Sequence, residues 1–349
     1  MKYVDANNKT APHPKQIEYL KKAIEIDSTL REPYDKLAGI YMGYPTVNTF
    51  STYYHDFSKA IPYYEKRLSF YEIPDQELLK KGLDSYLKEI NGKKYSPAGY
   101  NLSGLVRNYA SLYYLYKATG DVSKSDAYLS KLTQKVEMIN SVSYYMGAAS
   151  ALTHLLIWEE NVNEEILEKS LDFQQLALKK ANEGLKVVTA EEKPLLSLKY
   201  RELLKGVGAT HRALKNYTEA ENYLQQALAY PAVDLPAISR LKFGDSGFYE
   251  FPNRSVTVLK DIFQEKNGDY LYPIDAYSEM FFLRWEQNKP EEAFEWLEKA
   301  FQNSVEEHGN DVSGRWFEAG VLRTYPTLDQ ARFKALKAKY FPPTSTEKK

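Results

Sequence analysis

The stretch from Lys199 to Pro231 constrains the fold of this chain more than any other. Its sequence, KYRELLKGVGATHRALKNYTEAENYLQQALAYP, predicts two helices that fold back on each other around Asn216 and Tyr217. Gly208 in the first helix and Ala220 in the second are small enough to let the two backbones approach closely. Larger apolar residues at helical spacing are expected to fill the space around that contact: Leu204, Val207, Leu224 and Ala227. A hairpin of this kind cannot bury its apolar face alone, so we expect further hairpins stacked on it.

The spacing of these residues resembles the tetratricopeptide repeat (TPR), a helix–turn–helix unit of about 34 residues. The C-terminal ending also resembles the segment that often follows the last repeat in bacterial TPR proteins. The resemblance implies an all-α fold, a TPR-like α-α superhelix in which antiparallel helix pairs form a solenoid. It covers roughly 14–70, 102–160, 191–231 and 273–303, with the most specific patterns at 201–231 and 274–303.

The repeat phase predicts a single helical solenoid over residues 14–341. Residues 1–13 are polar and aperiodic, which predicts a flexible lead-in, and residues 342–349 are predicted to form a disordered tail. Insertions relative to regular repeats are expected at 43–55 and 232–255. The helices expected from apolar periodicity lie near 14–27, 33–42, 56–70, 74–90, 102–119, 122–139, 143–160, 163–187 and 255–266, besides the hairpins in 191–230 and 273–303 and two short helices in the C-terminal ending.

Two positions follow from the phase alone. Carrying it forward from Leu132 predicts a small residue near position 147, where Gly147 stands, followed by Ala148 and Ala149. In the repeat at 274–303, Phe281 occupies the position of the small residue, which predicts local repacking.

Composition excludes several classes of protein. The 46 basic and 47 acidic residues give a net charge of -1, so no general attraction to nucleic acid or to an anionic membrane is expected. The absence of cysteine excludes disulfides, thiolate metal sites and cysteine catalysis. No apolar run is long enough to span a membrane. The compartment stays open: the chain is expected to be cytoplasmic, or periplasmic or lipid-anchored if a leader was removed.

Catalytic patterns are weak throughout the chain. GDSG at 244–247 resembles the nucleophile segment of trypsin-like proteases, but a helical chain does not supply that β-barrel, so we interpret it as a turn. No two histidines stand at metal-ligand spacing, and no phosphate-binding or dinucleotide glycine pattern occurs. His211 is interpreted as a packed core residue, and the pairs Glu159–Glu160 and Glu164–Glu165 as helix-end residues. We therefore expect no enzyme, no cofactor and no metal, although His55 in the tyrosine-rich insertion is a candidate for testing.

The resemblance also nominates binding residues. In TPR proteins the second, fifth, ninth and twelfth positions of each first helix face the concave groove. Lys205 and Arg212 are basic, but Ala209 stands where chaperone-binding TPRs carry a clamp asparagine, which argues against binding of a terminal carboxylate. The mixture of aromatic and charged side chains suits an extended peptide or a partner helix. The candidate binding residues are Asp35, Arg107, Tyr114, Lys117, Glu202, Lys205, Arg212, Phe282 and Trp285.

The favoured hypothesis is a non-enzymatic scaffold that binds another protein or peptide in this groove, with no nucleic acid as partner. An open alternative for the groove is that its side chains are solvated or covered by the chain's own insertions. A second functional hypothesis is a surface or periplasmic (lipo)protein that binds a glycan or nutrient, and a third is an enzyme built on helical hairpins. Most tyrosines fall at core positions, but some could form an aromatic surface for a peptide or sugar: Tyr53, Tyr54, Tyr114, Tyr144 and Tyr145.

Overall fold

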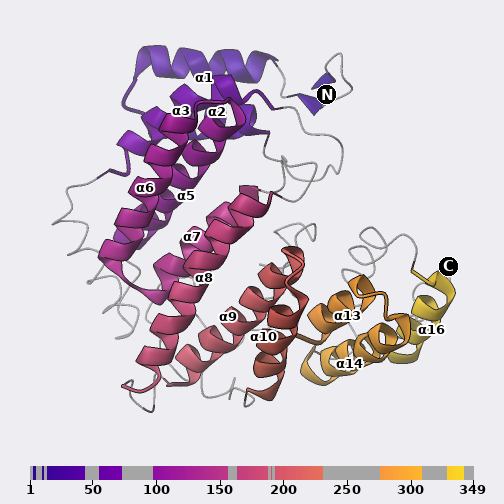
Figure 1. The fold of residues 1–349 in the computed structure, drawn as a ribbon. Coiled ribbons are helices and arrows are strands. Elements are labelled where there is room, and N and C mark those ends of the chain that lie inside the picture. The colour runs from indigo at the N-terminus through magenta and orange to yellow at the C-terminus, as the bar shows by residue number, and fades with distance from the viewer. Residues whose placement is uncertain are drawn as a thin grey trace. The chain divides into compact units, whose positions relative to one another are not determined.

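The computed structural model describes residues 3–4, 10–11, 14–43, 55–72, 97–155, 163–187, 190, 193–230, 276–308 and 328–341. These residues divide into two compact units, an N-terminal unit that ends at Phe173 and a C-terminal unit that begins at Gln174. Both units are built of packed helices (Figure 1), which confirms the all-α class. Within the part of the chain described, strands occur as one short antiparallel pair, β1 (Tyr3–Val4) with β2 (Thr10–Ala11).

In the N-terminal unit, successive helices pack against one another. They are α1 (Pro14–Ile26), α2 (Arg31–Met42), α3 (Phe57–Ser69), α5 (Pro97–Ala118), α6 (Val122–Ile139) and α7 (Val142–Leu155), followed by the first part of α8 (Glu164–Gly184). Each of these helices was predicted from apolar periodicity, and α6 has the predicted bounds. The helices predicted near 74–90 and 255–266 lie outside the described residues, as do most of the expected insertion at 43–55, all of that at 232–255, and the tail at 342–349.

The C-terminal unit contains the hairpin that the sequence predicts most strongly. Its helices are α9 (Lys193–Ala213) and α10 (Tyr217–Ala229). A second hairpin consists of α13 (Ala276–Glu286) and α14 (Pro290–His308), and α16 (Gln330–Tyr340) packs on α14. Because α13 packs on both α9 and α10, the second hairpin stacks directly on the first, although residues 230–275 separate them in the sequence.

Three hairpins share one turn. A residue with positive φ follows the first helix in each: Gly120 at 86°, Lys215 at 60° and Asn288 at 59°. In each case its N–H donates to the carbonyl three residues earlier, and the next N–H donates to the carbonyl five residues earlier, at 2.9–3.1 Å. The three hairpins can therefore be aligned residue by residue at this turn.

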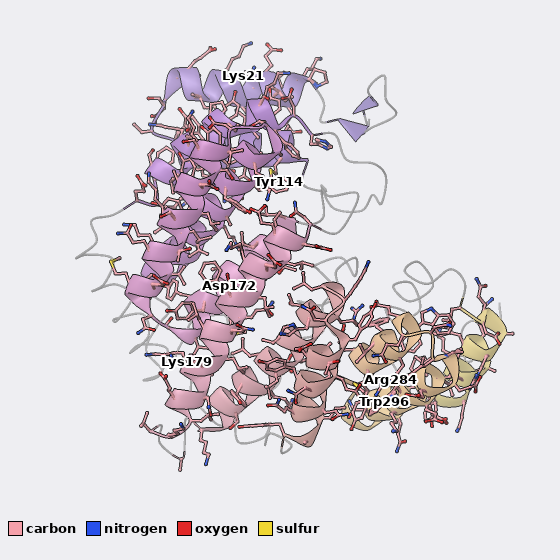
Figure 2. The ribbon with its side chains drawn as sticks, viewed as in Figure 1. Lys21, Tyr114, Asp172, Lys179, Arg284 and Trp296 are labelled. Carbon is pink, nitrogen blue, oxygen red and sulfur yellow. The ribbon has the colours of Figure 1, made fainter. Side chains whose placement is uncertain are left out.

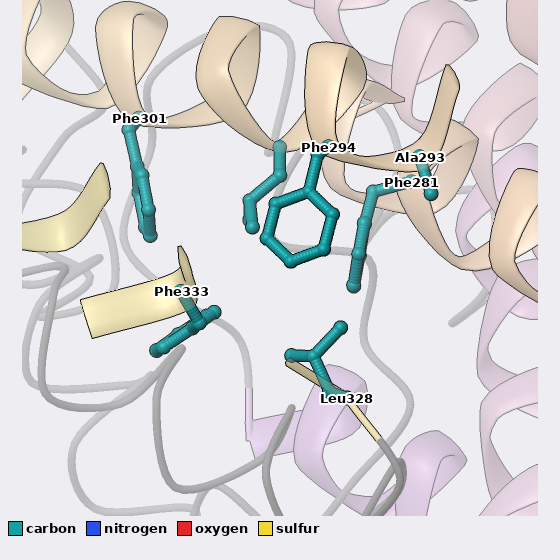
Figure 3. Close-up of a cluster of buried hydrophobic side chains, with 7 residues drawn as sticks. Phe281, Ala293, Phe294, Phe301, Leu328 and Phe333 are labelled. Carbon is teal, nitrogen blue, oxygen red and sulfur yellow. The ribbon is translucent and has the colours of Figure 1, made fainter. Parts of the chain in front are cut away.

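Gly208 provides the close helix contact that the sequence predicts. A Cβ atom at Gly208 would lie 2.8 Å from Leu224 Cγ and 3.2 Å from the carbonyl oxygen of Ala220. The equivalent pair in the next hairpin is Phe281 and Ala293, both fully buried. Figure 3 shows the ring of Phe281 in an apolar cluster with side chains of α14 and α16.

The expectation for Gly147 was wrong by one position. Gly147 is exposed, and a Cβ atom there would meet nothing within 4 Å. The buried small residues are its neighbours Ala148 and Ala149. The phase predicts a small residue in this turn of the helix, but it was carried over the α6–α7 junction, where the left-handed Asn140 alters the register.

In the N-terminal unit, several tyrosine hydroxyl groups donate hydrogen bonds to carboxylates of neighbouring segments. Tyr109 donates to Glu72 at 2.8 Å, and Tyr116 donates to Glu65 at 2.6 Å. Tyr128 stacks on Tyr116 at 5.6 Å and reaches the same Glu65. These rings fill the core while their polar ends satisfy carboxylates of neighbouring helices, which explains why many of the tyrosines at core positions are tolerated there.

Candidate functional site

The shared turn places three predicted binding residues at equivalent positions. Lys117, Arg212 and Trp285 each accept the N–H of the positive-φ residue of their turn through their backbone carbonyls. They are the twelfth positions of their helices in the TPR numbering used above. The same alignment makes Tyr114 and Phe282 equivalent ninth positions, and Glu202 and Arg107 equivalent second positions.

In the C-terminal unit, three predicted residues of α9 (Glu202, Lys205 and Arg212) form one file of alternating charge with two acids of α13, Glu279 and Glu286, which the sequence did not predict. Arg212 Nε donates to Glu279 Oε2 at 2.9 Å, although the two residues are 67 positions apart in the sequence. Arg212 also donates to Glu286. Lys205, two helical turns before Arg212 on α9, donates to Glu202 and is close enough to Glu279 to favour its charged form. Glu279 was not among the predicted residues, since it lies between the groove positions of its helix.

Burial and the neighbouring charge of Arg212 shift the pKa of the Glu279 carboxyl in opposite directions. The side chain is 1% exposed and that of Arg212 is 4% exposed. Burial raises the pKa of the Glu279 carboxyl above its usual value, and Glu286 acts in the same direction. Arg212 acts against both, because its positive charge and hydrogen bond favour the carboxylate. Arg212 is therefore the principal counter-charge of a buried acid.

Aromatic rings flank this file. The Arg212 guanidinium carbon lies 5.2 Å from the centroid of the Phe282 ring, within cation–π range. The next ring along the helix, Trp285, lies edge-on to Phe294 with centroids 6.3 Å apart. Phe282 and Trp285 are both half-buried. The sequence predictions place Arg212, Phe282 and Trp285 on one face; in the structure Arg212 lies over Phe282, and Trp285 follows about one turn later on α13.

A second buried ion cluster, absent from the sequence predictions, lies on another side of α13. Arg284 donates to Glu221 of α10, and its Nε lies 3.0 Å from Glu292 of α14. The hydrogen bond from Arg284 lowers the pKa of Glu221 below its usual value. The signal in the sequence was an arginine at the repeat position that holds His211 and Tyr116 in the other hairpins. Arg284 is labelled in Figure 2.

In the N-terminal unit, the predicted residues Asp35 and Lys117 form ion pairs with residues that were not predicted. Asp35 lies 2.8 Å from Arg67 and 3.3 Å from Arg31, and Arg107 is exposed. Lys117 pairs with Glu165, to which the hydroxyl of Tyr113 also donates. The counter-ions of Asp35 and Lys117 are thus residues that the sequence did not predict for this face. The face is therefore better defined in the C-terminal unit.

Tyr114 and Tyr145, which the sequence suggested for an aromatic surface, are buried. Tyr114 is 3% exposed and meets Phe57 edge-on at 5.5 Å, and Tyr145 is 5% exposed. Both rings are core residues, because their positions face neighbouring helices (Figure 2 labels Tyr114). Tyr144 is half-buried, while Tyr53 and Tyr54 lie outside the described residues. The glycan hypothesis stays an untested prediction.

The candidates for catalysis fall into three groups. His211 is buried and stacks on Tyr223 at 5.5 Å, which confirms its interpretation as a core residue. His55 stacks on Phe57 at 4.6 Å. GDSG at 244–247 and Glu159–Glu160 lie outside the described residues, and Glu165 pairs with Lys117.

Across the described ranges, no group of three His, Cys, Asp or Glu side chains is placed to hold a metal ion. Over the same ranges, every helix is too short or too polar to cross a bilayer.

Comparison with known proteins identifies the repeat. Residues 206–230 match the family model of the tetratricopeptide repeat, within the α9–α10 hairpin that contains Gly208, Ala220 and Leu224. No curated protein matches the chain. Among solved structures, BtubC (BKLC) from P. vanneervenii shares 17% identity, with 77% of this chain and 92% of that one covered and a TM-score of 0.34. The TPR domain of P58(IPK) shares 14% identity over 90% of this chain and 93% of that one, with a TM-score of 0.12. TM-scores below 0.5 do not establish a shared fold, so neither structure bears on the function.

Proposed function

We propose that this chain, a protein of the tetratricopeptide-repeat type, is a non-enzymatic scaffold that binds a peptide or partner helix on the face shared by α9 and α13. Repeats of this family generally bind other proteins or peptides and carry no catalytic machinery. One observation carries the choice of face. Groove positions of two consecutive first helices meet there, with Arg212 bonded to Glu279 and lying over Phe282.

The chemistry of this face suits a protein ligand. Interface energy is concentrated in tryptophan, tyrosine and arginine side chains that sit in partly desolvated surroundings. Trp285 and Phe282 are half-buried, so a partner that covers them removes apolar area from water without first ordering flexible side chains. Glu286 follows Trp285 on α13, and Glu202 lies further along α9; both offer charged hydrogen-bond acceptors that can fix the register of a bound segment.

Arg212 is a poor residue with which to test binding. Its removal would leave the buried Glu279 without its main counter-charge, so lost binding could reflect lost folding. Trp285 is a better choice, because the same hairpin carries a matched control. Trp296 of α14 is also a half-buried tryptophan, but it lies on the second helix of the repeat, where it packs against Tyr277 at 6.2 Å.

The experiment selects short random peptides on the full chain and measures the affinity of the selected peptide by fluorescence anisotropy. Trp285→Ala is expected to weaken binding by about tenfold or more, which corresponds to roughly 1.4 kcal/mol. Trp296→Ala is expected to change it by less than a factor of about two, at a similar loss of stability. Equal losses in the two variants, or failure to select any peptide, would show that the face is wrongly assigned.

A further inference from the structure

On the α9–α13 face, the basic side chains of Lys205 and Arg212 are more buried than the acidic side chains of Glu202 and Glu286. The two cations are withdrawn: the side chain of Lys205 is 10% exposed and that of Arg212 is 4% exposed. The anions at the two ends of the file keep more contact with water, with 38% of the Glu202 side chain and 23% of the Glu286 side chain exposed. The more exposed charges among these four side chains are therefore negative, although Arg201, 30% exposed, lies 4.0 Å from Glu202 and offsets part of that charge.

This sorting reverses what the amino-acid types alone suggest. Lys205 and Arg212 are the basic residues that would attract an acidic ligand, but their donors are directed at carboxylates of the chain itself. An incoming carboxylate would meet Glu202 or Glu286 before it reached either cation, and like charges brought together are repelled. A carboxylate has about four acceptor positions, so an end glutamate that already pairs with cations of the chain, as Glu202 does with Lys205 and Arg201, can still accept from another.

Aromatic rings lie beside the exposed acids. Glu286 follows Trp285 directly, and Phe282 lies one helical turn earlier on the same face of α13. A lysine or arginine that reaches Glu286 can place its methylene groups against these rings, and the ring faces themselves attract cations. The site thus combines anionic acceptors with apolar surface, which complements a segment that is both basic and apolar.

We propose that the partner segment is cationic: a peptide or helix in which lysine or arginine residues flank apolar ones, with the cations on Glu202 and Glu286 and the apolar residues on Phe282 and Trp285. This inference rests on the proposed function, since it assumes that the α9–α13 face binds a peptide. It adds the sign of the partner's charge. The net charge of the whole chain is only -1, so any strong preference for a basic peptide must come from a local site.

The test uses three fluorescein-labelled amphipathic peptides that share one pattern of leucine and tryptophan and carry lysine, glutamine or glutamate at the remaining positions. Binding to the full chain is measured by anisotropy at low salt and again at about 0.3 M salt, where charges are screened over a few ångströms. The lysine peptide is expected to bind about tenfold tighter than the glutamine peptide at low salt, and to lose most of that advantage at high salt.

Isosteric variants assign the preference to the two acids. Glu202→Gln and Glu286→Gln are each expected to weaken binding of the lysine peptide by about threefold to fivefold, and binding of the glutamine peptide by a clearly smaller factor. Glu298→Gln is the matched control, because Glu298 also pairs with a lysine, Lys339, but projects from α14. Circular dichroism of each variant establishes that it is folded.

The outcomes separate this inference from the proposed function. If the glutamine or glutamate peptide binds as tightly as the lysine peptide and remains sensitive to Trp285→Ala, the face binds peptides but the charge inference is wrong. If Glu298→Gln weakens the lysine peptide as much as the two test variants do, the charge inference is likewise wrong. If none of the peptides responds to Trp285→Ala, both the face and the inference fail.

Discussion

Replacement of Arg212 by methionine is the most informative perturbation of the C-terminal unit. Methionine keeps most of the side-chain length but removes the charge that compensates Glu279. Glu279 is 1% exposed and cannot turn toward water, so it would remain in the protein interior with its charge unopposed. Glu286, at 23% exposure, can be rehydrated at little cost.

The expected loss of stability follows from this difference in burial. Removing one member of a buried ion pair costs about 3–5 kcal/mol. Lys205 lies close enough to Glu279 to offset part of the loss, which places the expectation at the lower end, about 3 kcal/mol. The double variant Arg212→Met with Glu279→Leu removes both members of this buried pair, and such replacements are often neutral. It is therefore expected to recover to within about 1 kcal/mol of the wild type.

The single variant also acquires a pH dependence of known sign. Burial already raises the pKa of Glu279, and loss of Arg212 removes the main group that lowers it. Between the usual pKa of the carboxyl and its raised value in the fold, the folded state binds a proton that the unfolded state has released. Stability therefore increases as the pH falls through that window, and the destabilisation should be smaller near pH 5 than near pH 7.

Guanidinium unfolding followed by tryptophan fluorescence measures these quantities, because Trp285 and Trp296 lie in the same unit as Arg212. Lys339→Met, which removes an exposed partner of Glu298, is the control and should leave the transition unchanged. The reasoning would be refuted by an Arg212→Met variant within about 1 kcal/mol of the wild type, or by a double variant as unstable as the single one.

Three further predictions concern the same fold. Gly208→Ala should destabilise the fold by about 1–3 kcal/mol, since the new methyl group would lie 2.8 Å from Leu224 Cγ. Gly206→Ala, whose methyl group would meet nothing within 4 Å, should stabilise it by up to about 1 kcal/mol. Equal effects of the two variants in thermal unfolding would contradict this reasoning. His211 is buried and its pKa is lowered by burial, so stability should decrease as the pH falls below the usual histidine range, and His211→Phe should remove that slope from denaturation curves collected at pH 5–8. Asp121→Ala should cost about 1 kcal/mol in chemical denaturation because the side chain accepts the Lys124 N–H at the start of α6, while Asp121→Asn should be nearly neutral.

Local spacing in the sequence predicted the helices and their close contacts well. Gly208, Ala220 and Leu224 lie within one hairpin, so the 3.6-residue period and a short turn are enough to bring them together. The same reasoning failed at Gly147, because the phase had to cross a helix junction whose backbone geometry the sequence does not reveal. Positions inside a hairpin are therefore more predictable than positions carried from one hairpin to the next.

The partners of the candidate residues were beyond the reach of that reasoning. The repeat pattern predicts which way Arg212 points, but Glu279 comes from a helix 67 positions further along the chain. Since the pattern assigns faces and not pairs, it could not distinguish a cation offered to a ligand from one engaged with the chain's own carboxylates. Arg284 was missed for the same reason, because its partners Glu221 and Glu292 lie on two other helices.

The α9–α13 face depends on packing between hairpins and not on their proximity in the sequence. Met280 and Leu283 of α13 join Ala220 and Leu224 in one buried cluster, as the next repeat of a continuous stack would. Burial of apolar side chains such as Met280 and Leu283 stabilises this packing by about 1.5–3 kcal/mol each. Buried ion pairs are often neutral in net free energy, so the apolar cluster is the main source of the packing between the two hairpins. The register of the repeat can thus continue across residues 230–275, and two first helices that are distant in the sequence can form one binding surface.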